Sequence, residues 1–310
     1  MISEKQRKER SEYIGASDCA AVLGLSRWRT PLQIWGEKTG AMRQDDITEN
    51  LAIEVGTELE ELVCKLFAKR TGKEVRRVNE TQTHPKYPFI RCNIDRRVVG
   101  EDAVLEAKTA SAWKAKEWEG EEVPQEYILQ CLHQLAVTGK KVAYIAVLIG
   151  GNHSFVFKKI ERDEKIIDEI ISQEVKFWKE FVEKNVIPTT IKRQDSDALF
   201  TLFPNGNENE VPVELGEKAD RIMDNISALG KDMKNLEGIL DQQKNEIKAL
   251  LGDNSFGGTQ KWKVSWKNQV RSGLDMEALK REMPEVYEKF KKTSISRVLR
   301  ISAQEKVNGL

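Results

Sequence analysis

The sequence is poor in the residues that build thiolate metal sites. Its 310 residues include only 3 histidines and 4 cysteines. The cysteines stand singly, at positions 19, 64, 92 and 131, and form no Cys-x-x-Cys pair. Zinc and iron–sulfur sites need clustered thiolate or imidazole ligands, so the pattern argues against both. We expect four reduced thiols packed in a hydrophobic core.

Long apolar runs and an excess of one charge are also missing. The longest apolar run, residues 142–150, suits a buried strand, because a membrane span needs about 20 residues. The N-terminal stretch MISEKQRKERSEY lacks the apolar core of a signal peptide, so we expect none, and the reduced thiols favour the cytoplasm. With 50 basic and 50 acidic residues, the chain as a whole is not drawn to nucleic acid, and any anion must bind a local patch.

A hydrophobic content of 39% is enough for a packed core. Apolar spacing and capping residues predict helices over residues 17–24, 30–40, 49–72, 123–139 and 163–185. Alternating patterns predict strands over residues 88–99, 104–110, 141–150 and 155–162. Ser17 and Thr30 are the expected N-caps of the first two helices.

A polar stretch, residues 189–213, is predicted to link a domain of residues 1–188 to a C-terminal module of residues 214–310. In that module, apolar residues recur in steps of four and three from Leu215 to Leu250, interrupted at Gln243. This predicts a long helix whose apolar stripe packs on the body of the protein or on another copy. Short strands over residues 261–267 and 294–302 and a short helix between them complete the module.

The stretch VLEAKTA, residues 104–110, places Glu106 and Lys108 on one face of a strand. Asp95 ends the preceding strand, so the two carboxylates can meet at one edge of the sheet. Adjacent carboxylates repel unless a divalent cation lies between them, and oxygen ligands suit Mg²⁺ or Mn²⁺. Lys108 would then lie near the metal. There it could orient or deprotonate a water that attacks a phosphodiester, or neutralise the charge that develops.

An isolated Glu-x-Lys is common and is mostly a surface ion pair. Here the flanking helices add Glu60, which lies off the apolar stripe of its helix, and Gln130, which lies on a polar face. A helix–strand–strand–helix order that supplies an Asp, a Glu-x-Lys, an upstream Glu and a downstream Gln is much more specific than any one of these pieces.

The segments IGASDCAAVLG, GTELEELVCKLF, CNID, LEAK and YILQCLHQLAVTG resemble the YqaJ-type viral recombinase branch of the lambda-type exonucleases, in the PD-(D/E)xK nuclease superfamily. The resemblance covers about residues 7–185. It implies an α/β fold, a PD-(D/E)xK core with a mixed central sheet flanked by helices. The C-terminal module, with its long helix and short strands, lies outside it.

The resemblance also implies the activity, a Mg²⁺-dependent 5′-to-3′ exonuclease on double-stranded DNA ends. Such an enzyme leaves 3′ single strands for phage-type recombination by annealing. Asp95, Glu106 and the backbone carbonyl of Ala107 would hold Mg²⁺, or Mn²⁺ in its place. Glu60, possibly through water, Lys108 and Gln130 complete the implied site. A single-strand annealing protein, a trimeric ring and a phage or prophage origin in a bacterial cytoplasm are implied as well.

The family also binds a 5′-terminal phosphate through a basic residue and hydroxyls. By position these roles fall to Arg10 and Ser17, with Asn93 where the lambda-type relative has a serine. The motif's leading proline is replaced by Ile94. Arg27, Trp28 and Arg29 form either a DNA-contacting loop or an exposed loop with one anchoring aromatic residue.

Several residues have a purely structural interpretation as well as a functional one. His133 is expected to be a satisfied histidine, in the core or on the surface, rather than a metal ligand, and Trp113 and Trp118 are expected to pack rather than line a substrate groove. Residues 255–300 hold 11 Lys and Arg against 5 Asp and Glu. Lys261, Lys263 and Lys267 there are candidate nucleic-acid contacts, a docking site for an acidic partner, or a solvated strand face.

Two other functions remain open from the sequence. A PD-(D/E)xK endonuclease of restriction or repair type would cut a closed circle. A catalytically idle DNA-binding scaffold would cut nothing.

Overall fold

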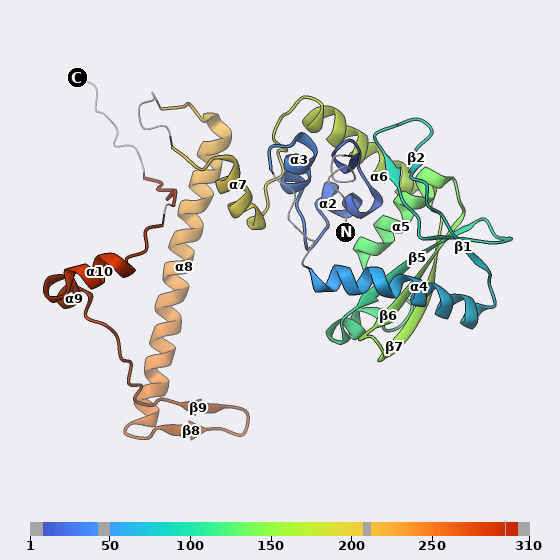
Figure 1. Cartoon of the computed structure of the whole chain (residues 1–310). Helices are drawn as coiled ribbons and strands as arrows, with labels where there is room; N and C mark the ends of the chain where they lie inside the picture. Colours follow the sequence, from blue (N-terminus) through green and yellow to red (C-terminus); the bar gives the residue numbers. More distant parts are fainter. Residues whose placement is uncertain (1–8, 43–49, 207–211, 295, 303–310) are drawn as a thin grey trace. The chain divides into compact units, whose positions relative to one another are not determined.

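The computed structural model describes residues 9–42, 50–206, 212–294 and 296–302 (Figure 1). The chain forms two compact units, Met1–Pro204 and Asn205–Leu310. No helix within the described residues has both the length and the apolarity that crossing a membrane requires.

The first unit is built on a mixed sheet of five strands in the order β1-β4-β5-β6-β7. The strands are β1 (Val75–Arg77), β4 (Arg96–Val98), β5 (Ala103–Ala110), β6 (Val142–Ile149) and β7 (Ser154–Glu161). β5 and β6 are parallel, and the other neighbouring pairs are antiparallel. The parallel pair needs a crossover, which η2 (Ala112–Trp118) and α5 (Gln125–Thr138) provide.

Helices cover both faces of the sheet (Figure 1). On one face, Phe67 of α4 (Leu51–Thr71) packs with Leu105 of β5 and Ala146 of β6. On the other face, Val104 and Ile145 pack with α5 and α6 (Glu164–Phe177). Because side chains alternate along a strand, Glu106 and Lys108 share the α5 face with Val104. The predicted α/β class, a mixed sheet flanked by helices, is confirmed.

The N-terminal helices confirm one predicted cap and correct the other. Thr30 caps α3 (Pro31–Thr39) by accepting a hydrogen bond from the Gln33 backbone N–H at 3.2 Å. The first helical segment is η1 (Ala16–Asp18) followed by α2 (Cys19–Val22), and Gly15 rather than Ser17 precedes it. Its polar contact comes from Asp18, whose Oδ2 accepts from the Gly15 N–H at 3.2 Å.

The strand predicted over residues 88–99 is broken. β3 (Arg91–Cys92) pairs with β2 (Gln82–Thr83), whereas β4 pairs with β1 and β5. The chain therefore changes partner strands at residues 93–95. The break places Asp95 outside the ladder, with its carboxylate directed at the backbone of β5.

The structural division at residue 204 lies later than the predicted boundary at residue 188. η3 (Trp178–Val182) continues α6 to residue 182, and η4 (Arg193–Asp195) and α7 (Ser196–Leu202) lie between residues 188 and 204. Asp195 is buried and accepts a hydrogen bond from the Thr30 hydroxyl, and Ala198 joins the core. These contacts attach part of the predicted linker, residues 193–202, to the first unit.

The second unit begins with the long helix α8 (Gly216–Leu251), as the heptad spacing predicts. β8 (Phe256–Gly258) and β9 (Lys263–Ser265) form a hairpin, followed by α9 (Met276–Glu282) and α10 (Pro284–Phe290). The strand predicted over residues 294–302 is wrong: residue 294 and residues 296–302 adopt no regular structure, and Ile295 lies outside the described residues.

Candidate active site

Asp95, Glu106 and Lys108 come together near the C-terminal half of β5, which is partly exposed. Lys108 Nζ lies 2.5 Å from Glu106 Oε1, and the Glu106 side chain is buried. Asp95 Oδ2 accepts a hydrogen bond of 2.8 Å from the Ala107 backbone N–H. The structure thus brings the two carboxylates and the lysine around Ala107, as the strand pattern predicts.

Two amides from α5 hold Glu106 in place. Gln130 Nε2 donates to Glu106 Oε1 at 2.5 Å, and Gln134 Nε2 donates to Oε2 at 2.6 Å and to the Asn93 carbonyl at 3.2 Å. The sequence prediction included Gln130 but not Gln134. The i,i+4 spacing puts Gln134 on the same polar helix face as Gln130, and that shared face was the available signal for a second amide in the site.

Arg96 is the second residue that the sequence prediction missed. Its buried guanidinium donates at 2.7 Å to Glu60 Oε1, to Glu61 Oε2 and to the Asp95 carbonyl. Glu60 therefore lies beside the site, but it is paired with Arg96 rather than free. The contact ties α4 to the turn that carries Asp95.

The pKa values of Asp95 and Lys108 are both raised, for different reasons. Burial, and then the nearby Glu106 carboxylate, raise the pKa of Asp95 to about 7, although the Ala107 N–H works against the shift. Burial alone would lower the pKa of Lys108, but the adjacent Glu106 outweighs it and the pKa is raised. Lys108 thus holds its proton and acts as a hydrogen-bond donor and a positive charge.

The residues present fit a divalent cation. The candidate ligands are carboxylate oxygens of Asp95 and Glu106 and the carbonyl of Ala107, a donor set that hard cations prefer. Asp95 Oδ1 is not engaged by the bond from Ala107, which uses Oδ2. Lys108 is the cationic side chain paired with Glu106, and the raised pKa of Asp95 reflects burial and the unfavourable proximity of the two carboxylates. A divalent cation between them would relieve that repulsion.

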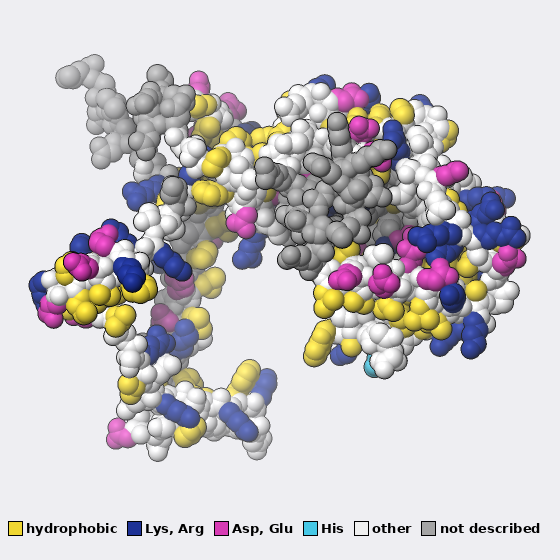
Figure 2. All heavy atoms as spheres, viewed as in Figure 1, with side chains coloured by type: hydrophobic (Ala, Val, Ile, Leu, Met, Phe, Trp, Pro, Cys, Tyr) yellow, Lys and Arg dark blue, Asp and Glu magenta, His cyan; other side chains and the backbone are white. Residues whose placement is uncertain are grey.

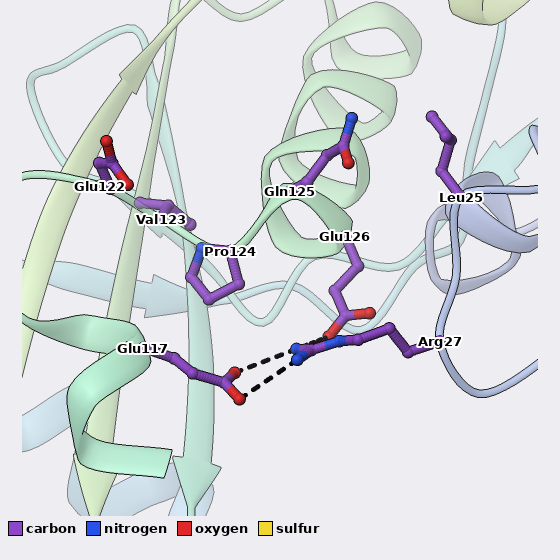
Figure 3. A pocket seen from close by; sticks show the side chains of 8 residues that line it. All are labelled: Leu25, Arg27, Glu117, Glu122, Val123, Pro124, Gln125 and Glu126. Carbon is purple, nitrogen blue, oxygen red and sulfur yellow. Dashed lines mark hydrogen bonds and ion pairs between the residues drawn. The ribbon is translucent and has the colours of Figure 1, made fainter. Parts of the chain in front are cut away.

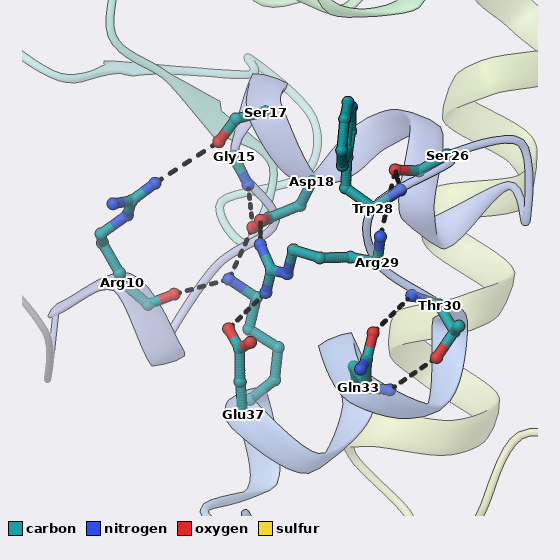
Figure 4. Close-up of polar contacts among 11 residues, drawn as sticks. Arg10, Gly15, Ser17, Asp18, Ser26, Trp28, Arg29, Thr30, Gln33 and Glu37 are labelled. Atoms are coloured by element: carbon teal, nitrogen blue, oxygen red, sulfur yellow. Dashed lines mark hydrogen bonds and ion pairs between the residues drawn. The ribbon is translucent and has the colours of Figure 1, made fainter. Parts of the chain in front are cut away.

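The predicted phosphate residues Arg10 and Ser17 also meet (Figure 4). Arg10 Nη2 donates to Ser17 Oγ at 3.4 Å, and Ser17 is exposed. Lys38 Nζ braces the pair by donating to the Arg10 carbonyl at 2.8 Å and to Asp18 Oδ2 at 2.7 Å. η1, which carries Ser17, packs on α5. Asn93 is exposed, and its carbonyl is bound by the same helix.

Arg27 and Arg29 are engaged with carboxylates (Figure 3, Figure 4). Arg27 lies 3.0 Å from Glu117 and 2.8 Å from Glu126, at the edge of a pocket of about 450 Å³. Arg29 pairs with Asp18 at 2.9 Å and with Glu37. Both guanidinium groups are therefore already paired with carboxylates of this chain.

The aromatic residues of this region divide into exposed and buried ones. Trp28 is 64% exposed, and Lys114 Nζ lies 4.2 Å from its ring centroid. Trp118 is buried, as expected. Trp113, expected to pack, is instead 94% exposed, because the short η2 turns it away from the core.

His133 lies in the core, one of the two positions that the sequence left open. It is fully buried, with Nδ1 2.8 Å from Glu174 Oε1 and Nε2 3.0 Å from the Arg91 carbonyl. The four cysteines are also buried and free, which confirms the expectation of reduced core thiols. The remaining candidates, Lys261, Lys263 and Lys267, lie in the second unit, on β9 and beside it.

Comparison with known proteins gives the family. The model of the YqaJ-like viral recombinase domain matches residues 5–141. Over 286 residues the chain is 37% identical to the uncharacterized protein YqaJ of Bacillus subtilis strain 168, covering 92% of this chain and 89% of that protein. This chain belongs to the YqaJ-like viral recombinase family.

The fold of the first unit has a counterpart among solved structures. An alkaline exonuclease, LHK-Exo from Laribacter hongkongensis, matches with a TM-score of 0.51 and 22% identity, over 59% of this chain and 94% of that one. Its complex with dAMP matches equally well, at 23% identity. At these identities the match establishes that the YqaJ-like chain shares the exonuclease fold.

Proposed function

We propose that this protein is a metal-dependent DNA exonuclease that digests duplex ends from 5′ to 3′. The observation that carries the proposal is the cluster of Asp95, Glu106 and Lys108, which combines metal-binding oxygens with a protonated lysine. The family match and the fold shared with an alkaline exonuclease support it.

Each residue has a distinct task in this proposal. A divalent cation bound by Asp95, Glu106 and the Ala107 carbonyl would lower the pKa of a bound water and attract the phosphate. Gln130 and Gln134 fix the orientation of Glu106 through its two oxygens. Lys108 donates to the phosphate and stabilises the negative charge of the transition state. Arg10 and Ser17 hold the 5′-terminal phosphate.

The finer parts of the proposal are the identity of the cation and the partners. We assign Mg²⁺, with Mn²⁺ as a substitute, and a 3′ single strand as product. A single-strand annealing protein, a homotrimeric ring and a bacterial cytoplasm as the site of action belong to the same proposal. The exposed apolar stripe of α8, which includes Ile222, Leu229 and Leu236, supports self-association. Light scattering on the full chain tests the trimer.

Three DNA substrates test the activity. A linear duplex with a 5′-phosphate, the same duplex with a 5′-hydroxyl, and a closed circle are each incubated with Mg²⁺. We expect label to be lost from the phosphorylated end and the circle to stay intact. Cutting of the circle would favour the endonuclease. No hydrolysis with Mg²⁺ or with Mn²⁺ would favour the idle scaffold.

Metal affinity should depend on pH through Asp95. Because its pKa is raised to about 7 without metal, the carboxyl is protonated below that pH, and a cation must displace the proton. We expect the affinity for Mn²⁺ to fall about tenfold per pH unit below pH 7. Calorimetric titration at pH 5.5, 6.5 and 8 measures this. In Asp95→Asn the dependence should flatten, and an equally steep slope there would contradict the assignment.

Arg10→Ala should weaken recognition of the 5′-phosphate. A hydrogen bond to a charged group contributes about 1.5–3 kcal/mol, so the preference for phosphorylated over hydroxyl ends should fall at least tenfold. The measurement is the ratio of initial rates on the two duplexes. The control is Arg162→Ala, which also removes an arginine but acts at the start of α6. An unchanged ratio in Arg10→Ala would show that Arg10 does not bind the 5′-phosphate.

A further inference from the structure

The hairpin of the second unit has one face turned to α8. Gly257 of β8 is paired with Val264 of β9, so both lie on the same face of the hairpin. Val264 and Trp266 line an apolar pocket of about 340 Å³ together with Leu240, Ile247 and other residues of α8. A Cβ on Gly257 would lie 2.7 Å from Leu251 of α8, so the glycine allows this close packing.

The opposite face of the hairpin presents an aromatic ring among lysines. By the strand alternation, Phe256, Lys263 and Lys267 lie on this outer face. Phe256 is 65% exposed, and Lys267 Nζ lies 4.3 Å from its ring centroid. Near the turn, Trp262 is also 65% exposed and carries Lys261 Nζ at 5.4 Å from its centroid. Two large rings are thus held open to solvent beside cationic groups.

The charge of this segment is one-sided although the chain is neutral. Residues 254–274 contain four basic side chains, Lys261, Lys263, Lys267 and Arg271, and no acidic one. Figure 2 shows lysine and arginine side chains spread over the hairpin. The surface therefore complements a polyanion.

We propose that the outer face of the β8–β9 hairpin, formed by Phe256, Lys263 and Lys267, binds single-stranded DNA together with Lys261 and Trp262, which lie beside the turn. Lysines contact the phosphates and the rings stack on unpaired bases, the combination typical of single-strand binding surfaces. A duplex keeps its bases stacked on each other, so they are not available to the rings. An acidic peptide has no bases on which the rings could stack. The inference rests on the proposed nuclease, whose product strand is the ligand.

The test is binding of a fluorescent oligothymidine by full-length protein. Every protein carries Lys108→Ala and is measured in chelator, so that no hydrolysis occurs. We expect Phe256→Ala to bind about tenfold more weakly, which corresponds to the loss of one stacked base. Lys263→Gln with Lys267→Gln should lower the slope of log affinity against log salt by about 1.4, the value for two phosphate contacts on a single strand.

Matched controls come from the same unit. Phe290→Ala removes another exposed ring, on α10, and Lys234→Gln removes an exposed charge from α8. Both should bind like the parent protein, and melting temperatures check that all variants fold. Hairpin variants that bind like these controls would overturn the inference. So would an equal loss on a duplex of the same length, or polyglutamate that competes as well as the oligonucleotide.

The two proposals fail in different assays. If the chain has no nuclease activity, the unmutated protein leaves all duplexes intact with Mg²⁺ and with Mn²⁺, whether or not the hairpin binds single strands. If the hairpin does not bind single strands, Phe256→Ala leaves oligothymidine binding in chelator unchanged, and the unmutated protein still cleaves duplex ends.

Discussion

Lys108→Ala is expected to reduce hydrolysis of linear duplex DNA by about 10²–10⁴-fold, the usual contribution of a positioned proton or charge donor. The ammonium lies 2.5 Å from Glu106, and Glu106 keeps it protonated. Without the ammonium, the site lacks the cation that would stabilise the negative charge on the phosphate in the transition state. Duplex binding should persist, because Arg10, Ser17 and the rest of the surface are untouched. Single-turnover cleavage and anisotropy of a labelled duplex measure the two effects separately.

Lys165→Ala provides the comparison for this change. Lys165 is exposed on α6, so the variant should cleave at the parental rate. Full activity of Lys108→Ala would remove the lysine from the reaction. A loss of activity accompanied by a large drop in melting temperature would assign Lys108 a structural role instead.

Glu174→Ala is expected to lower the free energy of unfolding by about 3–5 kcal/mol, the usual loss when one partner of a buried pair is removed. Glu174 and His133 are both fully buried, and His133 also binds the Arg91 carbonyl. Burial alone would lower the pKa of His133, but Glu174 outweighs it and raises the pKa. Removing the carboxylate leaves the imidazole without its charge partner between α5 and α6.

Urea unfolding measures this loss, with Glu169→Ala as the matched change on the exposed side of α6. That control should shift stability by less than about 0.5 kcal/mol. The pH dependence adds a second readout. Because the folded pKa of His133 is raised, its contribution to stability is complete below the unfolded pKa of 6.5 and is lost as the pH rises through the folded value. If Glu174→Ala is as stable as Glu169→Ala, the pair is not important for stability.

The central carboxylates and the lysine could be predicted because strand geometry is local. Glu106 and Lys108 share a face through a period of two, and Asp95 sits on the segment that pairs next to them. Gln130 follows from the polar face of an otherwise apolar helix. The mixed central sheet, in contrast, is implied by the resemblance to the PD-(D/E)xK nucleases and not by local geometry.

The features that could not be predicted are set by tertiary contacts. Nothing local indicates that Arg96 will be buried between Glu60 and Glu61, or that the strand will break at residues 93–95 to change partners. Gly15 rather than Ser17 precedes η1 because Asp18, which pairs with Lys38 and Arg29, accepts the hydrogen bond from the Gly15 N–H. Part of the predicted linker folds because Asp195 and Ala198 find places on the first unit.

The buried Arg96 limits which single substitutions this sequence can tolerate during evolution. Its guanidinium serves Glu60, Glu61 and the Asp95 carbonyl together, so an exchange at position 96 alone leaves carboxylates near the site without a counter-charge. An exchange of Glu60 alone leaves a cation in the interior with one partner fewer. Descendants of this sequence should therefore keep positions 60 and 96 or replace them as a set, and single steps between such sets should be rare.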